Sequence, residues 1–76
     1  MTLDLLPLGQ EAVITAVGGA GALRLRLLDM GLIPRTTVRV EKIAPLGDPI
    51  ELRVRGYALS LRKEDAHNIQ VEVKQV

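Results

Sequence analysis

The chain is 76 residues long, and 10 Lys and Arg residues against 9 Asp and Glu give it a formal net charge of +1. This near balance does not favour a strongly basic nucleic-acid-binding protein, and the absence of Cys excludes disulfide bonds and thiolate metal sites. Because 47% of the residues are hydrophobic and so small a domain buries only about 60% of its unfolded surface, we expect some apolar side chains to face outward and bind another protein.

The N-terminal segment and the apolar runs indicate where the protein works. Met1–Gln10 contains Asp4 and no Lys or Arg, so it lacks the basic start of a secretory signal. No apolar run approaches the ~18 residues that a membrane-spanning helix requires. No linker, repeat or low-complexity stretch interrupts the sequence. We therefore expect a single domain over residues 1–76, located in the cytoplasm and not itself spanning a membrane.

The first half of the chain predicts two strands with one helix between them. Glu11–Val17 is short, apolar and β-branched and follows the turn-forming Pro7-Leu8-Gly9, which favours a strand. A helical period runs over 22–30, and Gly31 can take the left-handed conformation that ends a helix. Apolar and charged residues then alternate over 36–43, which is typical of a half-buried strand.

The second half predicts a β-hairpin. Apolar residues alternate with polar ones over 50–54 and again over 57–61, with Arg55-Gly56 between them as a two-residue turn. A turn of that length places Val54 opposite Tyr57 and puts the apolar residues of both strands on one face. We therefore expect this face, including Tyr57, to be buried.

A short helical turn at 63–68 and an alternating strand at 69–73 complete the chain. Five short antiparallel strands are too few for a sandwich with two full layers, and closing them into a barrel would shield both edges. The predicted fold is mostly β with one inserted helix, a small SH3-like barrel of about five strands.

Three segments together resemble the FeoA family. They are Leu27–Pro34 (LLDMGLIP), Ala44–Ile50 (APLGDPI) and Ala58–Arg62 (ALSLR) followed by Ile69. Their order and spacing make the match specific as a set, and it spans nearly the whole chain. The resemblance implies a small cytoplasmic SH3-like protein that accompanies FeoB, the membrane transporter of ferrous iron, which has a cytosolic GTPase domain.

The sequence departs from the family pattern at one position. The family usually has Gly after the proline of the loop that leaves the helix, whereas here Arg35 follows Pro34. A type II turn needs a positive φ at that position, which is sterically unfavourable for Arg. We therefore expect a type I turn there.

Few side chains in the sequence could act as metal ligands. His67 lies near Glu64 and Asp65, but a structural zinc site needs four ligands and a ferrous site at least two His with a carboxylate. One His does not suffice. We interpret His67 as a surface residue and expect no resident metal or other cofactor.

Catalytic constellations are also lacking. A nucleophile needs a neighbouring base, usually oriented by a third group. Ser60 is the only Ser and His67 the only His, and nothing in the pattern brings them together. We therefore expect no catalytic residues and no enzymatic activity.

Two further patterns bear on anionic ligands. Gly18-Gly19-Ala20-Gly21 lies between a strand and a helix but matches neither the dinucleotide fingerprint nor the P-loop, so it is interpreted as a tight connection. Outward-facing arginines alternate with Glu41 and Glu51, and the single aromatic residue cannot form a stacking platform for bases. These arginines, Arg39, Arg53, Arg55 and Arg62, are interpreted as solvated charges, and no nucleic-acid partner is expected.

The helix has two apolar faces. Leu23, Leu27 and Met30 lie within a narrow arc assigned to the barrel, while three leucines cluster on the other side. A helix on a barrel buries only one such stripe, so the second must meet a partner, a second copy of the chain in a homo-oligomer, or Leu3–Leu8 folded back over it. The predicted partner-contact residues are Arg24, Leu25, Arg26, Leu28 and Leu32.

The sequence therefore predicts an accessory or regulatory protein of ferrous-iron uptake that binds a FeoB-type transporter through protein–protein contact. Two alternatives belong to other classes. One is a free-standing SH3-like domain related to the C-terminal domain of metal-dependent transcriptional repressors, and the other is an RNA-binding small barrel.

Overall fold

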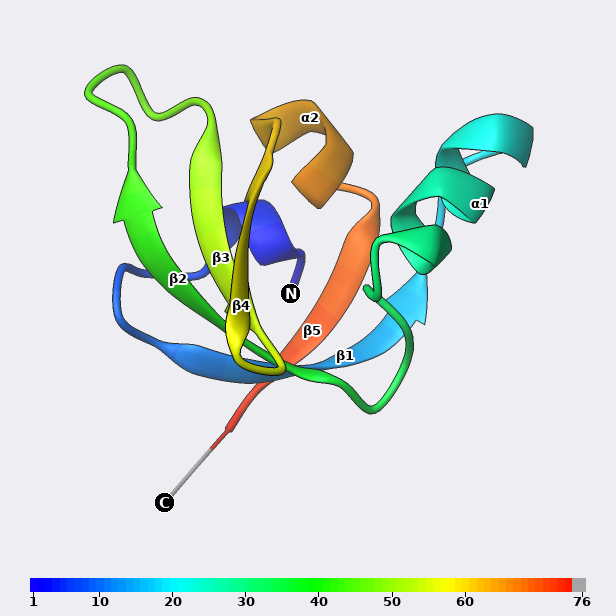
Figure 1. Ribbon diagram of the computed structural model, residues 1–76, viewed down its shortest axis with the longest axis horizontal. Helices are drawn as coiled ribbons and strands as arrows, with labels where there is room; N and C mark the ends of the chain where they lie inside the picture. Colours follow the sequence, from blue (N-terminus) through cyan, green and yellow to red (C-terminus); the bar gives the residue numbers. More distant parts are fainter. Residues whose placement is uncertain (75–76) are drawn as a thin grey trace.

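The computed structural model describes residues 1–74 (Figure 1). Its elements in chain order are η1 (Leu3–Leu5), β1 (Glu11–Val17), α1 (Gly21–Asp29), β2 (Thr37–Ile43), β3 (Ile50–Val54), β4 (Tyr57–Leu61), α2 (Lys63–Ala66) and β5 (Ile69–Val73). The five predicted strands and the main helix are confirmed. Neither α-helix is long and apolar enough to cross a membrane, within the residues described.

The five strands form one antiparallel sheet in the order β4-β3-β2-β1-β5. The sheet curves around its contents (Figure 1), helped by irregularities in register at Ile14/Ala16 in β1 and at Val40/Lys42 in β2. The expected closed barrel is wrong, because β4 and β5 remain the two edges of the sheet over residues 1–74.

The N-terminal segment explains why the sheet stays open. Val71 donates its backbone N–H to the carbonyl oxygen of Met1 at 2.8 Å, and Thr2 forms a β-bridge with Gln70. The outer edge of β5 is thus paired with the start of the chain and is not available to β4.

The predicted hairpin register is confirmed, with Val54 opposite Tyr57 and Ile50 opposite Leu61. Both turn residues have positive φ, 51° at Arg55 and 87° at Gly56, as a type I′ turn requires. Tyr57 was expected to be buried, but its side chain is 43% exposed. The reason is that β4 is an edge strand, so its first residue lies at the rim of the core.

The core is built from the concave face of the sheet together with three segments that cover it. The sheet contributes side chains such as Ile14, Leu52 and Ile69, all at most 1% exposed. The covering segments contribute Leu3 and Leu6 from the N-terminus, Leu27 and Leu32 from α1 and its exit, and Ala66 from α2. Because η1 packs on α2 and β5, the N-terminal segment completes this part of the core.

The loop after α1 differs from the prediction. Arg35 has a φ of 75°, and the backbone N–H of Thr36 donates to the carbonyl oxygen of Ile33 at 3.2 Å, so the turn is of type II. β1 imposes this geometry. The Arg35 N–H donates to the Ile14 carbonyl at 2.7 Å, and the Ile14 N–H donates to the Thr36 carbonyl at 2.9 Å. Two hydrogen bonds to one residue of β1 offset the steric cost of Arg at this position.

Candidate partner-binding surface

Helix α1 lies at one end of the sheet, beside the end of β1 (Figure 1). Two arginines hold it there. Arg24 donates from Nε to the carbonyl oxygen of Val17 at 3.1 Å, which ties the helix to β1. Arg26 donates from Nη2 to the carboxylate of Asp65 at 3.1 Å, which ties it to α2. Both arginines remain exposed, so they fix the helix and also border its outer surface.

The inward face of α1 is the predicted one. Leu27 is fully buried, and Leu23 and Met30 pack against the core with part of their surface exposed. On the other side Leu25 is 61% exposed. Leu28 is intermediate, because it too packs against the core. The expectation that Leu28 points fully outward is therefore wrong, and Leu25 is the exposed centre of this surface.

Leu32 is buried, contrary to the prediction that it belongs to the contact surface. Gly31, with a φ of 93°, ends the helix in a Schellman motif: its N–H donates to the Leu28 carbonyl at 3.0 Å, and the Leu32 N–H donates to the Leu27 carbonyl at 3.2 Å. In this motif the residue after the glycine packs back on the last turn. Leu32 was assigned wrongly because the helical period was continued past Gly31. The glycine marks the point in the sequence where that period ends.

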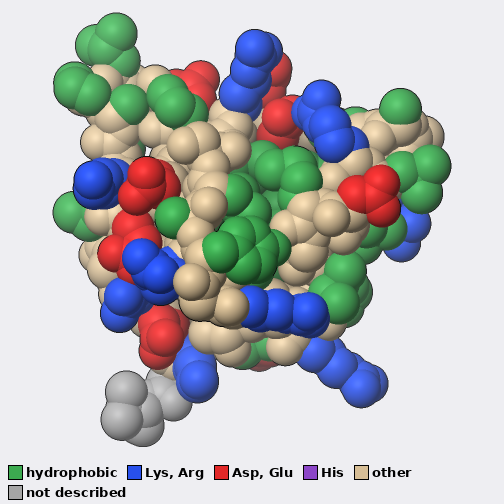
Figure 2. Space-filling model, viewed as in Figure 1, with side chains coloured by type: hydrophobic (Ala, Val, Ile, Leu, Met, Phe, Trp, Pro, Cys, Tyr) green, Lys and Arg blue, Asp and Glu red, His purple; other side chains and the backbone are tan. Residues whose placement is uncertain are grey.

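A hollow of about 440 Å³ adjoins α1 on the side of β4 and α2. Met30 and Leu61 form its apolar part, and Arg26, Ser60, Arg62, Glu64 and Asp65 surround them. Figure 2 shows hydrophobic side chains gathered over α1 and between α1 and β4. This hollow is a second feature beside α1, which the sequence did not predict, and Leu25 does not line it.

The two residues considered for catalysis, Ser60 and His67, border different hollows. Ser60 borders the hollow beside α1, whereas the side chain of His67 is 70% exposed and its Nδ1 lies 3.2 Å from Asp4 Oδ2. In the part of the chain described here, no three His, Cys, Asp or Glu side chains converge as a metal site would require.

Asp4, which contacts His67, has a carboxyl group with a perturbed pKa. Burial raises the pKa of this carboxyl, but hydrogen bonds from the Thr2 hydroxyl and the His67 ring outweigh burial and hold its pKa below the ordinary value. The carboxylate therefore joins the N-terminal segment to the residue that follows α2.

Residues 1–73 match the family model described as FeoA domain. The chain belongs to the FeoA family. It is 45% identical over 73 residues to the Fe(2+) transport protein A/Fe(2+) transporter FeoB fusion protein of Porphyromonas gingivalis. The match covers 96% of this chain but 9% of the fusion protein, so this FeoA domain corresponds to a small part of that relative.

Solved FeoA structures share the fold. The FeoA-like protein of Clostridium acetobutylicum superimposes with a TM-score of 0.92 at 37% identity, over 100% of this chain and 88% of that one. The FeoA of Stenotrophomonas maltophilia, described as an SH3 domain protein and solved as a zinc complex, has a TM-score of 0.84 at 30% identity, over 95% and 89% of the two chains. The SH3-like architecture and the predicted family are thereby confirmed, and the family is linked to ferrous-iron transport.

The repressor alternative is represented by a solved manganese-dependent transcriptional repressor, with a TM-score of 0.84 at 14% identity. The superposition covers 99% of this chain and 41% of that one. At this identity the likeness shows a shared fold alone.

Proposed function

We propose that this FeoA domain is an accessory protein of ferrous-iron uptake that binds the cytosolic side of a FeoB-type transporter through the outer surface of α1. The proposal rests above all on one relative, in which a matching segment and FeoB are parts of a single polypeptide. Fusion keeps two partners at a high effective concentration, which favours their contact.

The exposed surface of α1 supplies the contact. Leu25 presents a 61% exposed apolar side chain on a helix that is anchored at both flanks by Arg24 and Arg26. An apolar side chain on a rigid helix loses little conformational freedom on binding, and the arginines can pair with acidic groups at the rim. The role proposed is binding or regulation, with neither catalysis nor iron conduction carried out by this chain.

The test compares two leucines that are both exposed but lie on different parts of the surface. Leu25→Glu should reduce binding to detergent-solubilised FeoB at least tenfold, because it places an unpaired charge in an apolar contact. Leu46→Glu is the matched control, since Leu46 is 96% exposed at the tip of the β2–β3 loop. If Leu25→Glu binds as the wild type does, α1 is not the docking surface.

The same mixtures report on the mode of action. GTP turnover by FeoB would be measured with and without the FeoA domain, and again with the isolated GTPase domain. Binding with a changed rate would identify regulation, and binding with an unchanged rate would identify assembly. Light scattering on the FeoA domain alone would show whether the Leu25 surface instead joins two copies.

A further inference from the structure

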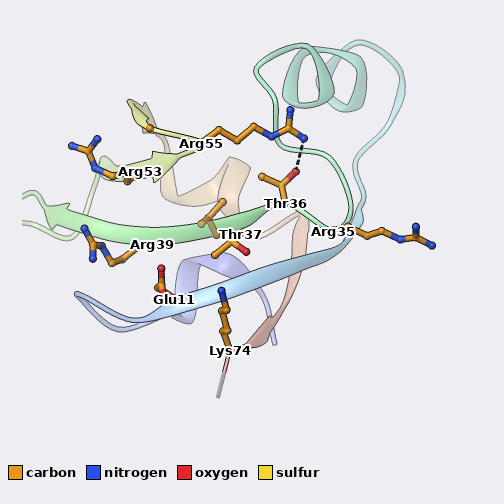
Figure 3. Close-up of a pocket in the computed structure, with 10 residues that line it drawn as sticks. Glu11, Arg35, Thr36, Thr37, Arg39, Arg53, Arg55 and Lys74 are labelled. Carbon is orange, nitrogen blue, oxygen red and sulfur yellow. Dashed lines mark hydrogen bonds between the residues drawn. The ribbon is translucent and has the colours of Figure 1, made fainter. Parts of the chain in front are cut away.

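A second concave surface lies away from α1 and is lined by basic side chains. It has a volume of about 540 Å³ and forms where β1 and β2 meet the β3–β4 turn and the residue after β5 (Figure 3). Its charged lining consists of Arg35, Arg39, Arg53, Arg55, Lys74 and Glu11. We refer to it as the basic groove.

The basic groove concentrates charge in a molecule with little net charge. Five of the ten Lys and Arg residues line it, together with one of the nine Asp and Glu residues. Arg39 and Arg53 are direct cross-strand neighbours, an arrangement of like charges that is unfavourable without a shared anion. Here Glu41 provides it, at 2.7 Å from Arg39 Nη2 and 3.1 Å from Arg53 Nε.

The other cations of the groove lack such a partner. Among residues 1–74, Arg35, Arg55 and Lys74 have no carboxylate within 4 Å. Arg55 donates from Nη2 to the hydroxyl of Thr36 at 3.3 Å, so its guanidinium extends toward the residue that precedes β2 (Figure 3). Guanidinium donors therefore remain free for an external anion.

The backbone provides an independent observation. In the described part of the chain, the non-glycine residues with positive φ are Arg35 (75°) and Arg55 (51°), and both line the basic groove. Arg has no special tolerance for this conformation, which Gly and Asn adopt far more readily. Residues held in unfavourable conformations cluster at functional sites. The chain thus keeps a positive charge at two positions where another residue would favour the fold.

The chemistry of the lining points to phosphate. Four of the five cations are Arg, whose planar fork of donors matches phosphate oxygens, and the hydroxyls of Thr36 and Thr37 lie between them. The lining contains no aromatic ring and therefore no aromatic platform on which a base would stack. Arg35 points away from the other cations (Figure 3), whereas Arg39, Arg53 and Arg55 offer separate guanidinium groups that suit a ligand with several anionic groups in a row.

We propose that the basic groove binds oligophosphate groups, either free or at the end of a nucleotide, without regard to the base. This inference is independent of the contact proposed for α1, because Arg24, Leu25 and Arg26 do not line the groove.

The ligand class is tested by calorimetry at physiological salt with orthophosphate, pyrophosphate, tripolyphosphate, ATP and GTP. Affinity should rise with the number of phosphates, tripolyphosphate should bind with a Kd below about 1 mM, and ATP and GTP should match it within about threefold. No binding of tripolyphosphate, or tighter binding of a single-stranded oligonucleotide or a glutamate-rich peptide than of tripolyphosphate, would overturn the proposal.

The site is tested with Arg55→Asn, which removes the charge and creates Asn-Gly, a preferred pair for a type I′ turn. This variant should unfold at a higher temperature than the wild type and yet bind tripolyphosphate at least about fivefold more weakly. Lys74→Gln should also weaken binding. Arg62→Gln is the control, since Arg62 is exposed and lies outside the groove, and it should stay within about twofold of the wild type. If Arg55→Asn and Arg62→Gln weakened tripolyphosphate binding equally, or if Arg55→Asn did not weaken it, the basic groove would not be the binding site.

Discussion

The Tyr57 hydroxyl donates a hydrogen bond of 2.5 Å to the carbonyl oxygen of Met30 and so connects the edge strand β4 to the C-terminal end of α1. Carbonyl groups in the last turn of a helix have no partner within the helix, and this bond satisfies one of them. Gly31 makes the approach possible, because a Cβ built on it would collide with the tyrosine hydroxyl. The start of β4 is therefore tied directly to the end of α1.

Tyr57→Phe should lower the free energy of unfolding by about 1 kcal/mol, since it removes the hydrogen bond and keeps the ring. Denaturation in urea, followed by circular dichroism, measures this difference. An unchanged midpoint would mean that water replaces the hydroxyl at no cost.

Gly31→Ala should be more damaging, because the new Cβ meets both a positive φ and the Tyr57 hydroxyl. We expect a loss of about 2 kcal/mol or more. The loss should shrink when the same change is made in Tyr57→Ala, where the collision is absent. A double-mutant cycle with no coupling between the two positions would refute the steric explanation.

Arg35→Gly should stabilise the fold by about 1 kcal/mol, because glycine adopts the φ of 75° without steric cost and retains the N–H that bonds to Ile14. Thermal unfolding in parallel with Arg35→Ala provides the comparison, since alanine removes the side chain but keeps the Cβ. If both variants are stabilised equally, the added stability comes from removal of the charged side chain and not from relief of the backbone conformation.

The two faces of α1 should respond differently to charge. Leu27→Glu should abolish cooperative folding, because Leu27 is fully buried and an unpaired buried carboxylate costs several kcal/mol, roughly the stability of a small domain. Leu25→Glu should change stability by less than about 1 kcal/mol. Melting curves of both variants check this, and the second result also validates the binding test on FeoB.

Acidification should destabilise the protein in part through Asp4. Its pKa is lower in the folded protein than in the unfolded chain, so its contribution is fully present above the unfolded value and is lost as the pH falls through the folded one. The effect therefore lies below about pH 4. Asp4→Asn should flatten the fall of unfolding free energy in that range, and an equally steep fall in the variant would assign the pH dependence to other carboxyl groups.

The strands could be predicted because alternation along the chain directly reflects which side chains face the core. The β3–β4 hairpin is the best case, since its turn length and its apolar pattern require the same register. The errors fall where a residue's environment is set by distant parts of the chain. Arg35 takes its positive φ because of hydrogen bonds to Ile14, and Tyr57 is exposed because β4 is an edge strand of an open sheet.

The candidate sites were predictable to different degrees. The helical period identified Leu25 as exposed and Leu27 as buried, because both lie within one regular element. The basic groove had no such signal. Arg39, Arg53 and Lys74 come from separate strands or their ends, and only the sheet order brings them to one concavity.

The sheet order also determines the sequence separation between strands that must pair during folding. β3 and β4 are joined by two residues, whereas β1 pairs with β5 so that Ala12 lies opposite Val73, near the other end of the chain. Closing so long a loop costs entropy before any contact is gained, and folding slows as contacts join more distant residues. We therefore expect the hairpin to form early and the β1–β5 pairing to limit the folding rate. Substitutions in β4, whose contacts are already formed when β1 and β5 pair, would then slow folding at least as much as equally destabilising substitutions in β5.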